Sequence, residues 1–473
     1  MEDSAIREEF RHLKPGTEYD ALYEAALCRE RSDWIVGINA TRLFSVLYGN
    51  TLNVGRVMSP TLALTVMREA AIAAFISEPF YTVKIQMDGF TASSERIKSK
   101  EEAEKLAADC KEASAVVAKV ERKNRKEKPP MLYDLTTLQR EANKIMGYTA
   151  QQTLDYAQSL YEKKMVTYPR TDSRYLTEDM AVMIPDLVQK TAKKFSFSDE
   201  TVPVRTGQVI NNKKVTDHHA IIPTKTAAET DLSALPAGEQ AVLELIARRL
   251  VCAVGIPSAS DETAVELSCA GADFKAKGSI VTEPGWKAFI SGVESGKEDK
   301  EEDALLIPDI QNGMELTVRE AVCKEGKTVP PKHYTEASLL QTMENAGAEE
   351  MPEDAERKGL GTPATRAGII EKLVRTGFLE RTGNKKTKYL IPTQKGTALV
   401  TILPEQIQSA SMTAEWEEKL LEIERGEYSG DAFMGEIEAM ISDLVKNYQM
   451  VPAAEILMPK QKSQGLGKCP VCG

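Results

Sequence analysis

The chain has 473 residues, of which 42% are hydrophobic and 28% are charged, and its formal net charge is −11 with an isoelectric point of about 5.3. This balance is typical of a globular protein with several domains, and the sequence supports neither a membrane-spanning run nor a signal peptide. The negative net charge argues against a protein that coats nucleic acid nonspecifically. A protein that is acidic overall can still bind nucleic acid if its basic residues line one groove. We therefore expect a cytoplasmic protein that makes no use of a membrane.

The first third of the chain changes from a helical to a strand pattern. Residues 1–76 are mostly helical, and Ser59 followed by Pro60 predicts the N-cap and first turn of a helix that runs to about Phe75. From residue 79 the sequence becomes alternating and β-branched, which predicts strands. A short helix over 96–110 follows.

Strand patterns continue on both sides of a long insertion. One strand leads into the basic stretch 119–128, and further strands are predicted in 261–290 and 303–323. We therefore expect one β-rich domain that is interrupted at about 129–250. The basic stretch is compatible both with a nucleic-acid surface and with ordinary surface solubility.

The insertion contains two helices and a polar segment. Gly147 is a suitable residue to end the first helix, and Thr149 with Gln152 predicts a capping box for the second. A strand that carries Tyr168 at its end is expected to follow directly.

A similar helix, helix and hairpin pattern recurs about two hundred residues later. Residues 333–347 predict a helix that ends at a glycine, Thr362 and Pro363 begin a second helix, and 378–393 predict a hairpin. This outline is typical of a winged helix, so both segments are candidates for that fold. Two helices that merely share a preference for an αα-hairpin would give a similar pattern.

The segment VTYPRTDSRYL, residues 166–176, has the residue types of a phosphate-attacking site. In an extended backbone Tyr168 and Arg170 would project from one face, because Pro169 fixes its own φ and disfavours helix at the preceding residue. A guanidinium fits phosphate oxygens, and a tyrosine phenol with a pKa near 10 needs such a cation to act as a nucleophile. A strand end with a packed tyrosine and a solvated arginine fits the residues as well.

The adjacent pair His218 and His219 lies in TDHHAIIPT and accounts for two of the four histidines of the chain. No third ligand is spaced to make this pair a zinc site. A histidine that donates to a phosphate is one interpretation, and a buried histidine with its hydrogen bonds satisfied is the other.

Several segments resemble type IA DNA topoisomerases, with details nearest to the topoisomerase III branch. They occur in the order of that family and span roughly residues 5–427. The matching segments are CRERSDWIVGINATR, NVGRVMSPTLALTVMRE, VTYPRTDSRYL, TDHHAIIPT, HYTEASLL with GLGTPATRAGIIEKL, and TAEWEEKLLEIERGE.

The resemblance implies an α+β multidomain fold, a toroidal core with winged-helix-like helical domains and a β-rich arch. It divides the chain into a helical gate domain (1–78 and 331–450), the β-rich arch (79–128 and 251–330), the inserted nucleophile domain (129–250) and a tail (451–473).

The same resemblance implies ATP-independent breakage of single-stranded DNA, strand passage and rejoining. Tyr168 would form a 5′-phosphotyrosine link, Arg170 would stabilise the phosphoryl transition state, and His218 would lie near the scissile phosphate. The remaining candidates would contact the phosphates of the single strand without reading its sequence. They are Arg29, Arg31, Arg42, Arg56, Ser59, Arg174 and Thr365.

The sequence departs from the family at both ends. The family's Mg²⁺ is held by an N-terminal Toprim domain with an Asp-x-Asp pair, and no such pair occurs in this sequence. Cys469 and Cys472 form only half of a zinc ribbon, so a bound Zn²⁺ is not expected from this chain. Met58 stands where the family usually has glutamine.

We therefore expect a fragment of a longer enzyme that binds single-stranded DNA but is poorly active alone. A Toprim-containing partner that acts in trans is a less favoured explanation. The alternative function is a DNA-binding protein with winged-helix modules that has lost catalysis. A tyrosine recombinase is disfavoured because its nucleophile usually follows the catalytic arginines and histidines, whereas Tyr168 precedes His218.

Overall fold

The computed structural model describes residues 7, 10–111, 113–290, 307–347 and 359–452. These residues form two compact units. Unit 1 combines the described parts of Met1–Ala70 and His333–Gly473, and unit 2 is formed by the described parts of Ala71–Lys332. The domain division implied by the sequence is finer than this split and stays a prediction.

Unit 1 is mostly helical. Its elements in chain order are η1 (Gly16–Tyr19), α2 (Asp20–Tyr48), α3 (Met58–Ala73), α10 (Glu336–Asn345), α11 (Pro363–Arg375), the strands β8 (Leu379–Gly383) and β9 (Lys388–Pro392), and the helices α12 (Gln394–Ile402), α13 (Glu405–Gln408), α14 (Ser411–Glu424) and α15 (Gly430–Asn447).

Helix α2 buries one stripe of its surface because small and apolar residues recur every three or four positions. The buried residues are Ala25, Cys28, Ser32, Val36, Ala40, Phe44 and Tyr48. The helix ends at Gly49, whose φ of +65° is the left-handed conformation that glycine adopts without a Cβ clash. Helices α14 and α15 pack against α2.

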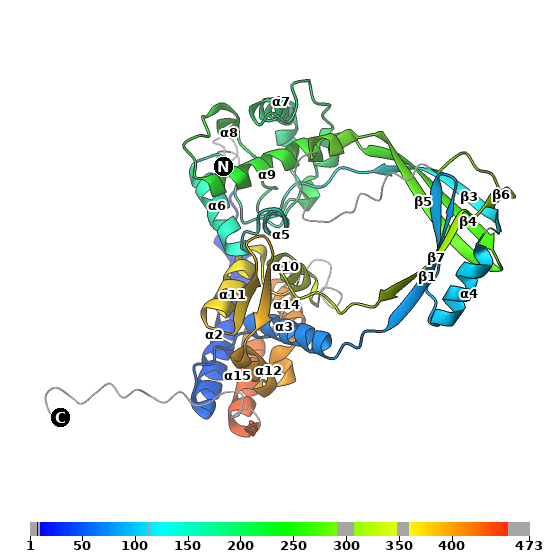
Figure 1. The fold of residues 1–473 in the computed structure, drawn as a ribbon. Helices are drawn as coiled ribbons and strands as arrows, with labels where there is room; N and C mark the ends of the chain where they lie inside the picture. The colour runs from blue at the N-terminus through cyan, green and yellow to red at the C-terminus, as the bar shows by residue number, and fades with distance from the viewer. Residues whose placement is uncertain (1–6, 8–9, 112, 291–306, 348–358, 453–473) are drawn as a thin grey trace. The chain divides into compact units, whose positions relative to one another are not determined.

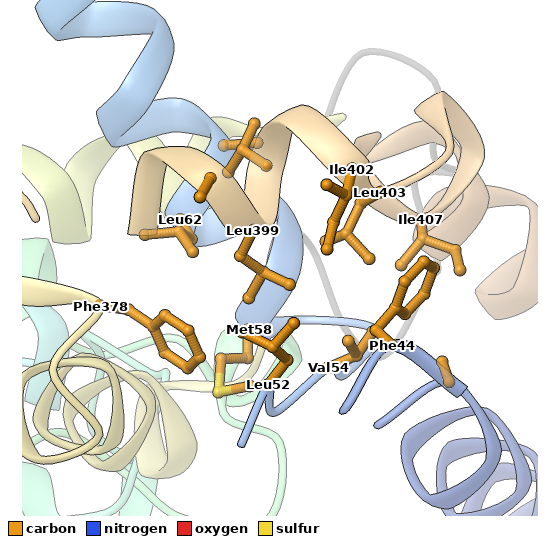
Figure 2. Packing of buried hydrophobic residues seen from close by; sticks show 14 of the residues in the cluster. Phe44, Leu52, Val54, Met58, Leu62, Phe378, Leu399, Ile402, Leu403 and Ile407 are labelled. Carbon is orange, nitrogen blue, oxygen red and sulfur yellow. The ribbon is translucent and has the colours of Figure 1, made fainter. Parts of the chain in front are cut away.

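The main core of unit 1 joins sequence segments that lie more than three hundred residues apart. Phe44, Leu52 and Leu62 from the N-terminal part pack with Phe378 and Leu399 from the C-terminal part (Figure 2). All five are fully buried. Burial of apolar side chains of this size is worth about 1.5–3 kcal/mol each. The two sequence segments therefore form one folding unit.

The predicted helix, helix and hairpin pattern in unit 1 is confirmed. Helix α11 begins at Pro363, and Thr362 with Thr365 forms its capping box. Strands β8 and β9 pair in an antiparallel hairpin directly after α11.

The prediction for the start of α3 is wrong. The helix begins at Met58, and the Ser59 N–H already donates to the Gly55 carbonyl at 2.9 Å, so Ser59 is not the N-cap. The reason is that Pro60, which has no N–H to donate, is tolerated anywhere in the first turn and does not fix the start of the helix to a single residue.

Unit 2 contains one large sheet and a group of helices. Its strands are β1 (Pro79–Met87), β2 (Phe90–Ser94), β3 (Ser114–Glu127), β4 (Ser258–Cys269), β5 (Ala272–Glu283), β6 (Glu315–Thr317) and β7 (Glu320–Lys327). Its helices are α4 (Lys100–Cys110), α5 (Leu135–Met146), α6 (Ala150–Glu162), η2 (Glu178–Val182), α7 (Ile184–Lys194), η3 (Thr206–Gln208), η4 (Asn212–Lys214), α8 (Lys225–Glu229), α9 (Ala237–Ala253) and η5 (Gly285–Phe289).

The sheet has seven antiparallel strands in the order β6-β3-β4-β5-β2-β1-β7. Figure 1 shows this sheet with α4 beside it. Helix α4 packs against β1 and β7. Strands β4 and β5 are joined by a two-residue turn in which Ala270 and Gly271 both have positive φ, as a type I′ turn requires. The strands predicted on both sides of the insertion therefore pair in one sheet, since β3 precedes the insertion and β4 follows it.

The basic stretch 119–128 lies on β3 up to Glu127, and several of its cations are paired with carboxylates. Arg125 pairs with Glu262 on β4 at 3.0 Å, and Arg122 pairs with Asp309 at 2.6 Å. Lys119 and Lys123 both contact Glu121. These exposed pairs neutralise much of the local charge, which favours the interpretation of surface solubility over a nucleic-acid groove.

The insertion differs from the predicted winged helix in its last part. Helices α5 and α6 are present, with Gly147 at the end of α5 and the Thr149–Gln152 capping box, as predicted. Isolated bridges follow α6 instead of a strand, among them Val166 with Pro223. Pro169 and Pro223 lack the N–H groups that a continuous ladder needs, which limits the pairing to single bridges.

The five cysteines among the described residues are all free, and four are buried. Within the described ranges no helix combines the length and the apolar character that crossing a membrane requires.

Candidate active site

Tyr168 lies in unit 2, just after a left-handed turn that ends α6. The N–H groups of Lys164 and Met165 donate to the carbonyls of Tyr161 and Leu160, each at 2.8 Å, and Lys164 has a φ of +59°. This is a Schellman motif with lysine at the position where glycine is usual. The turn sends the chain back along the segment that contains His218.

Two threonines hold the tyrosine segment against the histidine segment. The Thr167 hydroxyl donates to the Ala220 carbonyl at 3.0 Å and accepts from the Ile222 N–H at 3.0 Å. The buried Thr171 hydroxyl donates to the His218 carbonyl at 2.9 Å. Tyr168 therefore sits between two anchored positions.

The role of these threonines could not be predicted from the sequence. The only available signal was their spacing, one residue before and three residues after the tyrosine in VTYPRT. This spacing has a structural meaning only once the partner segment is known.

The rings of Tyr168 and His218 are in contact. Their centroids are 4.3 Å apart and the ring planes are inclined by 44°. Tyr168 is half-buried and His218 is exposed. Two motifs that lie fifty residues apart in the sequence thus supply a phenol and an imidazole to one partly open place.

Arg170 is exposed and has no ion-pair or hydrogen-bond partner among the described residues of the chain. The backbone bends at Pro169 and Arg170 instead of continuing as a strand, so the strand alternation on which the prediction was based is absent, and a shared face for Tyr168 and Arg170 stays a prediction. Arg170 is nonetheless only two residues from the phenol. Its charge is therefore available to an anion at this place.

Arg174 has a protein partner. Its Nε lies 2.5 Å from Oδ2 of Asp134, whose side chain is buried and whose other oxygen accepts from the Thr137 N–H at the start of α5. The arginine therefore fixes the start of α5 beside the tyrosine segment.

His219, the second histidine of the pair, is largely covered. Its Nδ1 lies 2.8 Å from the Ala220 carbonyl oxygen, and burial lowers the pKa of His219 below its ordinary value. Burial disfavours the charged imidazole, so the neutral form of His219 is favoured near pH 7. Of the two histidines, only His218 is in contact with the tyrosine ring.

The candidate DNA contacts in unit 1 fall into two groups. Arg31 and Arg42 on α2 are exposed, and within the described residues neither forms a hydrogen bond or ion pair. Arg29, by contrast, pairs with Glu417 of α14 at 2.8 Å.

Arg56 is buried in an ion network between α2, α14 and the segment before α3. It pairs with Asp33 at 2.6 Å and with Glu417 at 3.1 Å, and its guanidinium lies 5.3 Å from the ring centroid of Trp416. Burial works against the charged form of Arg56, but its hydrogen bond with Asp33 and the charges of Asp33 and Glu417 outweigh this effect and raise the pKa of Arg56 above its ordinary value. Arg56 therefore links α2, α14 and the segment before α3.

The hydroxyls of Ser59 and Thr365 both form hydrogen bonds with the backbone at the starts of helices. The Ser59 hydroxyl is buried and accepts from the Gly55 N–H at 3.2 Å. The Thr365 hydroxyl accepts from the Thr362 N–H at 2.9 Å, but Thr365 itself is exposed. Of the two, only Thr365 is open to a ligand in this arrangement.

No metal site is found in the part of the chain that the structure describes. No group of three or more histidine, cysteine, aspartate or glutamate side chains there could hold a metal ion. The described residues thus do not fit the Mg²⁺ that the family resemblance implies. Cys469 and Cys472 lie outside the described residues.

Comparison with solved structures identifies the fold of this chain. The structure of full-length topoisomerase I from Thermotoga maritima matches 90% of this chain and 69% of its own length, with a TM-score of 0.68 and 24% sequence identity. The fold is therefore that of a type IA topoisomerase, as the sequence resemblance predicted. A sequence profile of the DNA topoisomerase family matches residues 17–435.

Curated relatives agree with the profile. DNA topoisomerase 3 of Bacillus subtilis is 37% identical over 94% of this chain, that of Bacillus licheniformis is 36% identical over the whole chain, and that of Staphylococcus aureus is 35% identical over 99%. The chain belongs to the type IA DNA topoisomerase family. It spans slightly less than two thirds of the length of these relatives, from 63% to 66%.

Proposed function

We propose that the chain breaks and rejoins single-stranded DNA through Tyr168, as part of a type IA topoisomerase reaction with strand passage. The observation that supports this most directly is the contact between the rings of Tyr168 and His218, at 4.3 Å, with the exposed Arg170 two residues away. A nucleophile, a group that can donate hydrogen bonds and a permanent cation are what attack on a phosphodiester requires.

In the proposed reaction the phenol oxygen of Tyr168 forms a bond to a backbone phosphorus, and the bond from that phosphorus to the 3′ oxygen breaks. The phenol loses its proton and the leaving 3′ oxygen gains one, which yields a 5′-phosphotyrosine link and a free 3′-hydroxyl. Because one phosphodiester replaces another, rejoining is the reverse of the same step and needs no ATP.

The charged groups have separate roles in this proposal. Arg170 stabilises the negative charge on the phosphoryl oxygens as the transition state forms. His218 donates a hydrogen bond to a phosphate oxygen beside the phenol. Mg²⁺ would be supplied by a Toprim-containing segment that acts with this chain.

The single strand is proposed to contact exposed cations and hydroxyls. Arg31 and Arg42 on α2 and Thr365 at the start of α11 are open to phosphates. Arg29, Arg56, Ser59 and Arg174 have protein partners, so we propose that each of them holds helices and segments of its own unit in place.

The test is covalent capture on labelled DNA. The full chain is mixed with an end-labelled single-stranded oligonucleotide and Mg²⁺, with and without a separately produced Toprim domain, and is then denatured. We expect a covalent adduct that Tyr168→Phe abolishes and that the matched control Tyr175→Phe retains.

Two results would overturn the proposal. An adduct that persists in Tyr168→Phe would place the nucleophile elsewhere. Binding of the oligonucleotide with no adduct under either condition would favour the alternative, a single-stranded-DNA-binding protein with winged-helix modules.

A further inference from the structure

The ring of Tyr168 has a second aromatic contact, which belongs to neither of the two motifs that form the candidate site. Tyr161 of α6 lies edge-to-face against it, with centroids 5.3 Å apart and planes inclined by 79°. This is the geometry that the aromatic quadrupole favours. Tyr168 is therefore held by one imidazole and one phenol.

Tyr161 is placed by the end of α6. Its carbonyl accepts from the N–H of Lys164 in the Schellman motif, so the same turn that sends the chain toward Tyr168 also fixes the backbone of Tyr161. Tyr161 and Tyr168 thus lie on either side of the turn at which the chain reverses its direction.

The last turn of α6 is anchored from outside as well. Glu239 of α9 is buried and accepts from the Ser159 hydroxyl at 2.9 Å and from Lys163 Nζ at 2.5 Å. Ser159 and Lys163 are on either side of Tyr161 in the sequence. A buried carboxylate that bonds to both restrains the helix end that carries the ring.

The backbone hydrogen bonds of the site do not by themselves orient the nucleophile. Thr167 and Thr171 fix the main chain on either side of Tyr168, but a change of χ1 from one staggered rotamer to another would still carry the phenol oxygen to a different place. The terminal torsion χ2 is broad and sets the plane of the ring, so neighbouring groups must select both the rotamer and the ring plane. Tyr161 and His218 are the aromatic neighbours that the structure provides among the described residues.

We propose that Tyr161 is a positioning residue that holds the Tyr168 ring in the orientation required for attack on the phosphate. This inference rests on the proposed function of Tyr168. The action of Tyr161 is through its ring, because within the described residues the two tyrosines share no hydrogen bond. Tyr161 touches no reacting atom in this proposal.

The kinetic test compares Tyr161→Ala, Tyr161→Phe and the unchanged chain. Single-turnover formation of the covalent adduct is measured at saturating single-stranded oligonucleotide, with Mg²⁺ and the added Toprim domain, and affinity is measured separately by fluorescence anisotropy. We expect Tyr161→Ala to slow adduct formation by roughly tenfold or more with the dissociation constant unchanged. Tyr161→Phe keeps the ring and is expected to restore the rate.

Three kinetic results would overturn the proposal. Wild-type speed in Tyr161→Ala would show that the ring positions nothing. Weaker binding with an unchanged rate at saturation would make Tyr161 a DNA contact. A Tyr161→Phe variant as slow as Tyr161→Ala would show that the hydroxyl is the active group.

A second measurement tests the positioning without relying on catalysis. 3-Fluorotyrosine is placed at position 168 and its ¹⁹F resonance is followed in the full chain without DNA. We expect Tyr161→Ala to shift or broaden the resonance and Tyr161→Phe to leave it nearly unchanged; an unchanged resonance in Tyr161→Ala would contradict the inference. If the unchanged chain forms no adduct at all, the proposed function fails, whereas the ¹⁹F result still decides whether Tyr161 orients Tyr168.

Discussion

Arg56 and Glu417 form a buried ion pair at 3.1 Å although they are 361 positions apart in the sequence. Each side chain is only 3% exposed. Glu417 also pairs with Arg29, and Arg56 also pairs with Asp33. Three separated motifs of the family, near residues 28–42, 53–69 and 413–427, therefore meet in one charge network inside unit 1.

Glu417→Ala is expected to destabilise unit 1 by about 3–5 kcal/mol, because it leaves Arg56 buried without one of its two carboxylates. The measurement is urea unfolding followed by the fluorescence of Trp416, which lies in the same network. Glu418→Ala is the matched control, since Glu418 is exposed on the same helix and should change stability by less than about 0.5 kcal/mol. Equal effects of the two substitutions would contradict the assigned role of the network.

Local patterns in the sequence predicted much of the fold. The capping box at Thr149, the helix start at Thr362 and Pro363, the glycine at 147 and the hairpin after α11 depend on residues within a few positions of one another, and all are present. The strands on both sides of the insertion followed from the change in periodicity.

Features that depend on distant partners could not be predicted. The role of Thr171 depends on the His218 carbonyl, and the burial of Arg56 depends on Glu417. The strand expected at Tyr168 failed because prolines in both segments interrupt the pairing. The left-handed lysine at 164 was missed because lysine gives no signal for that conformation.

Lys164→Gly is expected to stabilise unit 2. Lys164 has a φ of +59°, which costs a residue with a Cβ about 1–2 kcal/mol, and glycine avoids this cost at the expense of more freedom in the unfolded chain. We expect a net gain of the order of 0.5–1 kcal/mol in the free energy of unfolding. Lys164→Ala keeps the Cβ and serves as the control. If alanine stabilises as much as glycine, the side chain and not the backbone conformation is responsible.

Lowering the pH should reduce the free energy of unfolding of unit 2, because His219 is buried there. Burial lowers the pKa of His219 in the folded state, so below the ordinary histidine value of about 6.5 the unfolded chain binds this proton more readily. The contribution is therefore present above that value and is lost as the pH falls. Urea unfolding at about pH 7.5 and about pH 5.5 is compared for the unchanged chain and His219→Gln. If the unchanged chain and His219→Gln lose the same amount of stability between the two pH values, His219 is not the cause of the loss.

Arg42→Ala is expected to weaken binding of single-stranded DNA equally for different sequences. Loss of one phosphate contact should also reduce the slope of log affinity against log salt concentration by about 0.7. Val46→Ala, four positions further along α2 at an 80% exposed residue, is the matched control and should change neither quantity. Fluorescence anisotropy titrations at several salt concentrations measure both. An unchanged slope for Arg42→Ala would remove Arg42 from the proposed contacts.

Thr171→Val should slow adduct formation while the affinity for DNA is retained. The Thr171 hydroxyl donates to the His218 carbonyl at 2.9 Å and accepts from the Ser173 N–H at 3.1 Å. Valine has nearly the same shape as threonine but can form neither hydrogen bond. Leaving these buried groups unpaired costs about 1–3 kcal/mol and loosens the segment that carries His218. Thr171→Ser keeps the hydroxyl and should remain near the unchanged rate. If serine and valine are equally slow, packing of the methyl group, and not the hydrogen bond to the histidine segment, is what the site requires at this position.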